Sequence, residues 1–499
     1  MSKYYMGIDQ GTTGTTVLIL DENWNCLSKG YKEHTQFFPQ PGWVEHDPLE
    51  IWDKLREAVL MAMDDAGMDN VDDIACIGLD NQGETVVLWD NVTGMPVYNA
   101  IVWQDCRTAG EADKIGKKYG QMIKKKTGLV VDAYFSATKI KWIIDNIPGV
   151  QEKIDRNRIN AGTLDAWMIW KMTHGKTFAT DQSTASRTML FNIHTGQWDD
   201  EILEALSIPK SILPEIKDSS GVYGVTDPLD FFGARIPISG SLVDQQAALF
   251  GQACFEAGTV KTTYGTGCFM LMNTGNKPTS SDNGLLTTVG WGLNNGQMTF
   301  ALDGGIYTAG AAVQWLRDKM RIIANASETE KIAKSVPDTG GVYFVPAFSG
   351  LAAPHWNQYA RGTIVGMTGG TTREQIIRAT LESMAYQVKD ILDVMVEDSG
   401  IPIEVMRVDG GAAVNEFLMQ FQADILGIPI DVPEITETTA LGAAYLAAYG
   451  IGEFRSLDDI KGRWKLKKRY IPKMDEKTRI RMLHKWHKAV ERAKDWEKD

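Results

Sequence analysis

The chain has 499 residues, several times the length of a typical domain, which predicts two large domains with separate cores. Hydrophobic residues make up 43% and charged residues 23%, a globular balance that excludes long disordered or low-complexity tracts. The formal net charge of −13 disfavours nonspecific binding to nucleic acid or anionic lipid. No segment has the roughly 18 to 20 apolar residues of a membrane span. We therefore expect neither nucleic acid nor a membrane as a partner.

The first residues lack the pattern of a signal peptide, so we expect a cytoplasmic location. The five cysteines are scattered along the chain and form no Cys-x-x-Cys pair. We expect all five to be buried, reduced thiols.

The N-terminal segment has short apolar runs at residues 4–8, 15–20 and 26–27, separated by polar turns. These runs predict an antiparallel meander. A helix is predicted to begin after Asp47, with Pro48 at its first position and Glu50 at its third. Further strands are expected at residues 74–79 and 85–89, which makes the first half α/β in class.

A similar layout begins again about 250 residues later. Strands are predicted at residues 258–264, 268–272 and 405–408, and helices at about 309–320, 415–426 and 477–496. The recurrence predicts a duplicated α/β unit with a nucleotide held between the turns of its two copies. No linker rich in Pro or Ser separates the halves, so we place domains at 1–248 and 249–499, joined at a hinged cleft.

Turns rich in glycine and threonine are the candidate phosphate-binding sites. Residues 9–14, Asp-Gln-Gly-Thr-Thr-Gly, can direct backbone N–H groups at phosphate, and the carboxylate of Asp9 can hold Mg²⁺ through water. An ordinary hairpin turn is the alternative. Glycines at 265, 267, 410 and 411 allow close approach of a phosphate or purine, and a helix start after Asn415 adds partial positive charge. Three such turns at comparable places favour nucleotide binding over coincidence.

Asp244 precedes an apolar helical run near the expected domain boundary. A carboxylate inside the cleft can accept the proton of a substrate hydroxyl as that oxygen attacks the γ-phosphate. A helix N-cap is an equally good interpretation of the spacing.

Longer stretches resemble the glycerol kinase group of the FGGY carbohydrate kinases over essentially the whole chain. The matching segments are residues 9–13, 41–48, 98–104, 185–194, 264–273, 377–383 and 441–446. Two stretches, around residues 134–146 and 362–382, resemble the family signatures. The resemblance implies two actin-like (ribonuclease H-like) lobes with a nucleotide and substrate cleft between them.

The resemblance also implies roles for single residues. The cofactors would be ATP and Mg²⁺, with Asp244 as the catalytic base and Asp9 as the carboxylate associated with the metal ion. The nucleotide would be held by Thr12, Thr13, Gly14, Thr266, Gly267, Gly310, Gln314, Gly411 and Asn415. The polyol would be held by Gly83, Glu84, Trp103, Tyr134, Asp244, Gln245 and Phe269. A homodimer or homotetramer is expected.

Two residues beside the expected polyol site depart from the family pattern. Gly83 stands where most glycerol kinases have an arginine, so a group with several donors is lost and volume is expected to open. A buried substrate hydroxyl left unpaired costs about 1–3 kcal/mol. Val243 stands at a position that is usually Gly and is expected to narrow one wall. The stretch 349–357 also differs from the usual pattern.

These features predict ATP-dependent phosphorylation of a terminal hydroxyl of a small polyol, with glycerol as the first candidate. A larger polyol or ketose, such as erythritol, another tetritol, a pentitol or xylulose, is the competing substrate. A non-catalytic, actin-like nucleotide sensor is the alternative from another class, and the retention of Asp9, Asp244 and the three turns argues against it.

Overall fold

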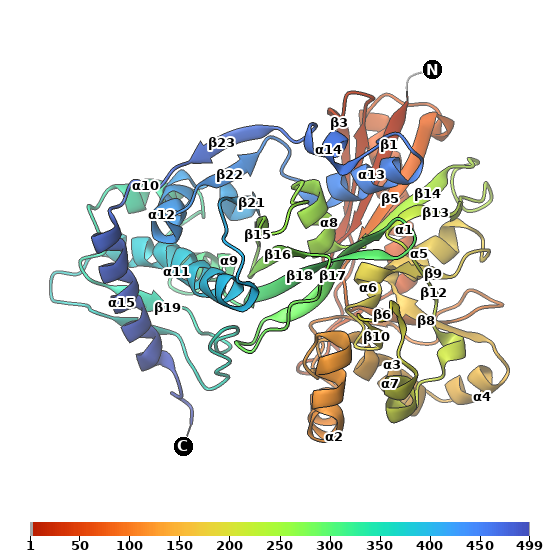
Figure 1. The fold of residues 1–499 in the computed structure, drawn as a ribbon, viewed down its shortest axis with the longest axis horizontal. Coiled ribbons are helices and arrows are strands. Elements are labelled where there is room, and N and C mark those ends of the chain that lie inside the picture. Colours follow the sequence, from red (N-terminus) through yellow and green to blue (C-terminus); the bar gives the residue numbers. More distant parts are fainter. Residues whose placement is uncertain (1–2, 499) are drawn as a thin grey trace.

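The chain folds into two α/β lobes that lie side by side in the computed structural model, which describes residues 3–498 (Figure 1). The N-terminal lobe, mostly red to yellow-green, centres on a six-stranded sheet in the order β13-β14-β5-β1-β2-β3. Its strands are β1 (Tyr4–Gln10), β2 (Gly14–Leu20), β3 (Cys26–Glu33), β5 (Ile74–Asn81), β13 (Ser220–Val225) and β14 (Pro237–Val243). Strands β1, β2 and β3 are antiparallel neighbours, which confirms the predicted meander.

The C-terminal lobe centres on a seven-stranded sheet in the order β17-β18-β16-β15-β21-β22-β23. Its strands are β15 (Val260–Tyr264), β16 (Cys268–Gly275), β17 (Leu286–Leu293), β18 (Gln297–Ile306), β21 (Met406–Gly410), β22 (Ile430–Pro433) and β23 (Leu466–Tyr470). In each sheet a first strand pairs antiparallel with the next and parallel with a later one: β1 with β2 and β5, and β15 with β16 and β21. The predicted duplication of an α/β unit is therefore confirmed.

Smaller sheets and helices complete the N-terminal lobe. The additional strands are β4 (Glu45–His46), β6 (Val86–Asp90), β7 (Ala100–Ile101), β8 (Ile159–Thr163), β9 (Ala179–Asp181), β10 (Phe191–Asn192), β11 (Gln197–Trp198) and β12 (Glu215–Lys217). The helices are α1 (Pro48–Asp65), α2 (Ala109–Thr127), α3 (Ser136–Asn146), α4 (Val150–Asp155), α5 (Leu164–Met172), α6 (Gln182–Ala185) and α7 (Asp200–Leu206). Helix α1 begins as predicted, because the Asp47 side chain accepts a hydrogen bond from the Leu49 backbone N–H at 2.9 Å.

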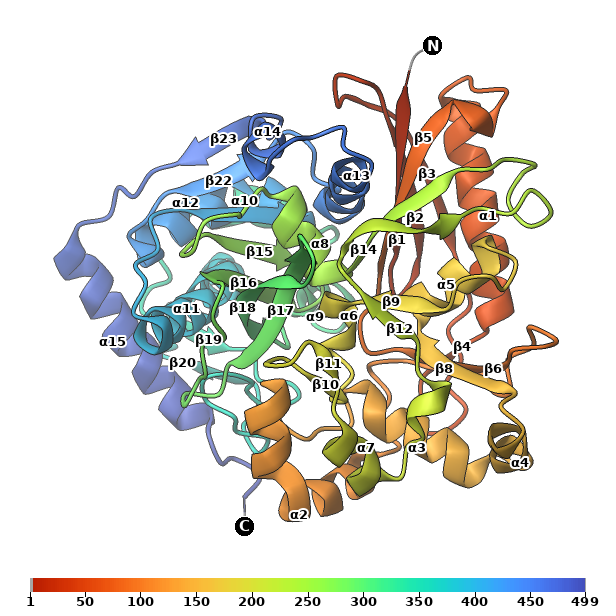
Figure 2. The same ribbon diagram turned by 45° about the vertical axis from the view of Figure 1, so that its right-hand side comes forward.

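The C-terminal lobe carries most of the remaining helices and a short two-stranded sheet. These elements are α9 (Gly310–Asp318), α10 (Glu328–Lys334), β19 (Tyr343–Val345), β20 (Thr363–Val365), α11 (Arg373–Ser399), α12 (Glu416–Leu426), α14 (Leu457–Lys461) and α15 (Glu476–Ala493). The predicted terminal helix is α15, which lies along the outer edge of the lobe and buries Trp486 and Val490 (Figures 1 and 2).

Two helices, α8 (Asp244–Gly251) and α13 (Thr438–Gly450), pack against each other beside the N-terminal sheet. Helix α13 comes from the second half of the chain, yet it lies on β1, β5 and β14. The contact is close, since a Cβ at Gly78 would lie 1.9 Å from the Ala443 carbonyl oxygen. The expected boundary between residues 248 and 249 falls inside α8, and α13 is a helix that the second half contributes to the first lobe.

Within residues 3–498, no helix combines the length and the apolar character that crossing a bilayer demands. The five cysteines are free of disulfides, but Cys26 and Cys106 are exposed. The expectation that all five are buried is therefore wrong for these two. Cys26 begins β3 at the edge of its sheet, and Cys106 lies in the loop between β7 and α2.

Candidate active site

The first glycine- and threonine-rich turn joins β1 to β2 at the cleft side of the N-terminal sheet. The Gly11 N–H donates to the Gly14 carbonyl at 3.0 Å and closes the turn. The Trp103 indole N–H donates to Thr12 Oγ1 at 2.9 Å, which ties this turn to a residue expected at the polyol site. Gly14 itself packs tightly, because a Cβ there would lie 2.4 Å from the Lys32 carbonyl oxygen. Its missing side chain therefore serves the packing of β2 on β3.

Three aspartates gather where β1, β5 and β14 end. Burial raises the pKa of Asp9 to about 6. Burial and the nearby charges of Asp9 and Asp244 raise the pKa of Asp80 well above its usual range. Within residues 3–498, neither carboxyl oxygen of Asp80 has a hydrogen-bond donor. A divalent cation fits Asp9 and Asp80, because Mg²⁺ is commonly bound by one or two carboxylates together with water and substrate phosphate. In the described part of the chain, no three His, Cys, Asp or Glu side chains could hold a metal ion together.

Asp244 is the first helical residue of α8, directly after β14. Its Oδ1 accepts a hydrogen bond from the Gln245 N–H at 2.7 Å, while the N-cap position belongs to Val243 and no side chain caps the helix. The N-cap interpretation of Asp244 is therefore wrong. Burial, followed by the negative charges of Glu84 and Asp9, raises the pKa of Asp244 to about 7. A carboxylate that titrates near neutrality is suited to general-base chemistry.

Asp244 lines a pocket between the lobes that also contains the other residues expected at the polyol site. This reaction pocket is lined by Thr12, Gly83, Glu84, Trp103, Tyr134, Arg187, Val243, Asp244, Gln245, Gln246, Phe269 and Asp303. The Trp103 and Tyr134 rings meet edge to face with centroids 5.6 Å apart. Carboxylates and an amide thus face aromatic side chains, as in sites that fix hydroxyls while packing on a carbon chain.

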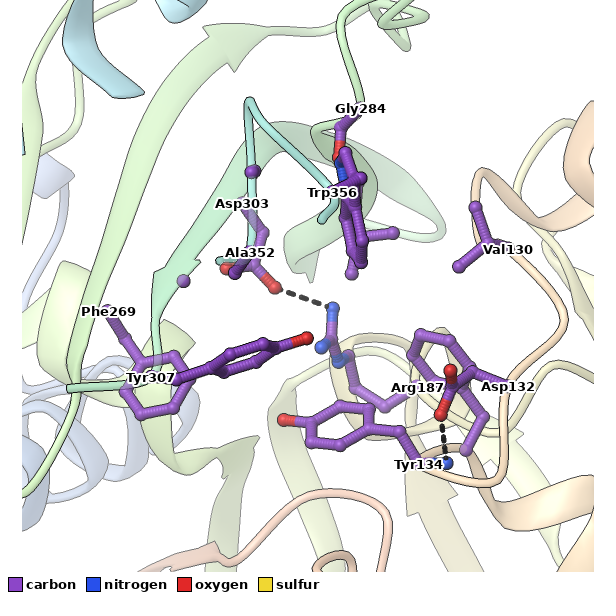
Figure 3. A pocket seen from close by; sticks show the side chains of 14 residues that line it. Val130, Asp132, Tyr134, Arg187, Phe269, Gly284, Asp303, Tyr307, Ala352 and Trp356 are labelled. Carbon is purple, nitrogen blue, oxygen red and sulfur yellow. Dashed lines mark hydrogen bonds and ion pairs between the residues drawn. The ribbon is translucent and has the colours of Figure 1, made fainter. Parts of the chain in front are cut away.

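Arg187 and Asp303 were missed by the reasoning from sequence. The Arg187 guanidinium donates through Nε to Glu84 Oε1 at 2.7 Å, and its Nη1 lies 3.0 Å from Asp303 Oδ2 (Figure 3). Burial opposes its charge, but Glu84 and Asp303 raise the pKa of Arg187. A charged residue just before the apolar run Met189-Leu190-Phe191 was the available signal.

Gly83 and Val243 lie side by side in the wall of the reaction pocket. A Cβ at Gly83 would lie 2.8 Å from Val243 Cγ2, and Val243 is almost fully buried. The expectation that Gly83 opens volume is therefore wrong, because the Val243 side chain occupies the adjoining space. What the pair does produce is a wall segment without a side-chain donor or acceptor.

The second set of turns lies in the C-terminal lobe around a cavity of about 680 Å³. Five of the residues expected at the nucleotide line it, namely Thr266, Gly310, Gln314, Gly411 and Asn415. Gly267 does not line this cavity, and a Cβ there would lie 2.5 Å from the Ile306 carbonyl oxygen. The cavity also contains Arg317, Thr329, Glu330 and Met384, which the sequence did not single out.

Local hydrogen bonds fix the walls of this cavity. The Gly310 N–H donates to the Gly265 carbonyl at 3.1 Å and holds the start of α9 on the turn after β15. Asn415 caps α12, since its side chain accepts from the Leu418 N–H at 3.0 Å. The predicted helix start is confirmed, and the cavity is framed by two helix N-termini.

Lys261 on β15 is a buried cation between the two sets of turns. Its Nζ donates to Gln245 Oε1 in the other lobe and to Thr263 Oγ1 at 3.1 Å. Burial lowers the pKa of Lys261, and Asp409, Asp244 and Asp303 partly offset this effect. A lone lysine in a strand gave no signal in the sequence.

Two lobes with a duplicated strand layout, glycine- and threonine-rich turns in both lobes and a buried aspartate in the pocket between them, its pKa raised to about 7, are the arrangement expected of a sugar or polyol kinase. Comparison with known families agrees. Residues 4–251 match the N-terminal domain, and residues 260–451 the C-terminal domain, of the FGGY family of carbohydrate kinases. The chain belongs to this family, as its sequence motifs predicted.

Close relatives cover the full chain. Glycerol kinase 2 of Thermotoga maritima is 56% identical over 497 residues, which are 99% of this chain and 100% of the relative. The glycerol kinase of Caldanaerobacter subterraneus is 55% identical over 99% of both chains. Among solved structures, Plasmodium falciparum glycerol kinase with ADP superposes with a TM-score of 0.92 at 40% identity, covering 99% of this chain and 98% of that one. A xylulose kinase from Lactobacillus acidophilus has the same fold, with a TM-score of 0.85 at 20% identity over 98% of this chain and 97% of that one.

Proposed function

We propose that this kinase transfers the γ-phosphoryl group of ATP to a terminal hydroxyl of glycerol or of a closely related small polyol. The observation that carries the proposal is the placement of Asp244, whose pKa is about 7, in a pocket it shares with Glu84 and Gln245. The names of the relatives, at 54–56% identity, support glycerol as the acceptor. Plasmodium falciparum glycerol kinase with ADP supports an adenine nucleotide.

The residues around Asp244 suit an in-line phosphoryl transfer. Asp244 accepts the proton of the terminal hydroxyl while the new O–P bond forms and the bond from the γ-phosphorus to the bridging oxygen of ADP breaks. Glu84, Tyr134 and Gln245 orient the substrate hydroxyls, and the rings of Trp103 and Phe269 pack on its carbons. Enclosure between two lobes keeps water from competing as the nucleophile.

The glycine- and threonine-rich turns of both lobes would hold the nucleotide so that its γ-phosphate faces the substrate hydroxyl that reacts. We assign Thr12, Thr13 and Gly14 to the phosphates from the N-terminal lobe, and Thr266 and Gly267 from the C-terminal lobe. The base and ribose would occupy the 680 Å³ cavity beside Gly310, Gln314, Gly411 and Asn415. Neutralisation of phosphate charge is the chemistry that Mg²⁺ supplies when bound, and Asp9 and Asp80 are the residues that would hold it.

The test is ADP release by the purified protein, with ATP and Mg²⁺, in the presence and absence of glycerol. The expected result is ADP formation that depends on glycerol, with glycerol 3-phosphate identified by phosphorus NMR. ADP formation at the same rate without any polyol contradicts the proposal. Nucleotide binding without any turnover favours the alternative of a non-catalytic sensor.

We also propose, from the family resemblance, that the protein forms a homodimer or homotetramer in the cytoplasm. Light scattering coupled to size-exclusion chromatography tests the assembly, and a monomer at all concentrations contradicts it.

A further inference from the structure

A second cavity, of about 150 Å³, adjoins the reaction pocket. We call it the annex. Tyr134, Arg187, Phe269 and Asp303 line both spaces, so the annex begins where the reaction pocket ends. Its further lining consists of Val130, Asp132, Phe135, Gly284, Leu286, Gly305, Tyr307, Ala352, Ala353 and Trp356 (Figure 3).

Aromatic rings form much of the annex wall. Tyr307 is 53% exposed and Trp356 is 48% exposed, so both rings present faces that the protein itself leaves uncovered. Trp356 is held in place by its indole N–H, which donates to the Gly284 carbonyl at 3.0 Å. Figure 3 shows the Tyr307 ring reaching toward the Arg187 guanidinium across the cavity. Fixed aromatic faces beside polar groups suit the C–H and O–H groups of an open-chain carbohydrate.

The charges in and beside the annex disfavour an anionic ligand group. One guanidinium, Arg187, faces the carboxylates of Glu84 and Asp303, and Asp132 adds a third carboxylate on the loop before α3. The three carboxylates outnumber the single positive charge of Arg187, so a carboxylate or phosphate on the ligand would be repelled by net negative charge. Neutral hydroxyls meet no such repulsion.

The wall formed by Gly83 and Val243 offers no side-chain donor or acceptor, and it lies beside Arg187, whose Cγ would be 3.9 Å from a Cβ at Gly83. Substrate hydroxyls near this wall therefore depend on neighbouring side chains, among them Glu84, Tyr134 and Arg187. Two of these three, Tyr134 and Arg187, also line the annex. A substrate chain bound by them is directed from Asp244 toward the annex.

We propose that the annex is a binding subsite for the distal carbons of a neutral open-chain polyol longer than glycerol, with four or five carbons. This inference rests on the proposed function, because the terminal hydroxyl of the same molecule faces Asp244. Arg187 and the tyrosine hydroxyls bind the distal hydroxyl groups, while Tyr307 and Trp356 pack on the distal carbons. Specificity for acceptor length therefore depends on Tyr307 and Trp356, which line the annex and not the reaction pocket.

The test compares kcat/KM for glycerol, erythritol and the pentitols, with a five-carbon aldonate as the anionic counterpart. The wild type is expected to phosphorylate a tetritol or pentitol at least as well as glycerol. The aldonate is expected to be poorer by about tenfold or more, because its carboxylate faces Asp303 and Asp132.

Two annex variants give the decisive comparison. Val130→Trp fills the cavity, and Trp356→Ala removes a wall, so each should lower kcat/KM for the longer polyol about tenfold and leave glycerol within about twofold. Val92→Trp, at a 72% exposed position outside both cavities, is the matched control and should change neither value. Thermal unfolding of each variant separates a folding defect from a change in specificity.

The outcomes separate the two proposals. If the wild type phosphorylates glycerol but no longer polyol, or if both annex variants lower all substrates equally, the annex subsite is refuted and the proposed function stands. If the wild type phosphorylates no polyol at all, the proposed function itself fails.

Discussion

The contact between Gly83 and Val243 yields a stability prediction whose magnitude follows from the structure. Gly83→Ala adds a methyl group 2.8 Å from Val243 Cγ2, closer than two carbon atoms pack. The Gly83 backbone does not have a positive φ, so conformational strain does not add to the clash. Forcing a methyl group into a filled space costs about 1–3 kcal/mol of unfolding free energy.

The matched background is Val243→Ala, which removes the clashing methyl group. In that background Gly83→Ala should be nearly neutral, so the coupling energy of the double-mutant cycle should be about 1–3 kcal/mol. Urea unfolding, monitored by tryptophan fluorescence, gives the unfolding free energy of all four proteins. The values are compared when the four proteins have the same m-value. A coupling energy that does not differ from zero would refute the claim that Val243 fills the space beside Gly83.

Three further predictions concern the base, its lysine neighbour and the packing of α13. The acid limb of the kcat profile, measured from about pH 5 to pH 9, should fall as Asp244 is protonated below its pKa of about 7, and a flat profile would exclude Asp244 as the titrating base. Lys261→Met removes a charge that lowers the pKa of Asp244, so this limb should move to higher pH, and an unmoved limb would contradict the electrostatic role of Lys261. Gly78→Ala should lower the unfolding free energy by about 1–3 kcal/mol, because its Cβ would meet the Ala443 carbonyl. The control Gly110→Ala, where nothing lies within 4 Å, should not destabilise the protein, and equal unfolding of Gly78→Ala and wild type would contradict the close packing of α13.

The parts of the fold that depend on local signals could be predicted from the sequence. The meander from β1 to β3 followed from short apolar runs and polar turns, and the start of α1 followed from Asp47 and Pro48. The placement of α13 on the N-terminal sheet could not be predicted in this way. This placement depends on glycines such as Gly78, whose lack of a side chain lets α13 approach the sheet. Because Gly78 is far from Ala443 in sequence, the contact between them is visible only in the structure.

Some residues of the candidate site could likewise be predicted from the sequence, and others could not. Asp244, Glu84 and Trp103 were named from motifs, and the structure brings them into one pocket. Arg187 and Lys261 were missed, because their importance comes from ion pairs and hydrogen bonds between distant segments. The effect of Gly83 on volume was misjudged for the same reason: its neighbour Val243 lies 160 positions further along the chain.

We propose that Asp244 activates an alcohol between two turns that hold one nucleotide. Asp244→Asn, which keeps the size of the side chain, tests it most directly through single-turnover phosphoryl transfer and ATP affinity measured on the same protein. The transfer rate of this variant is expected to be at least about 100-fold below wild type, with ATP affinity unchanged. A transfer rate within about tenfold of wild type would contradict it.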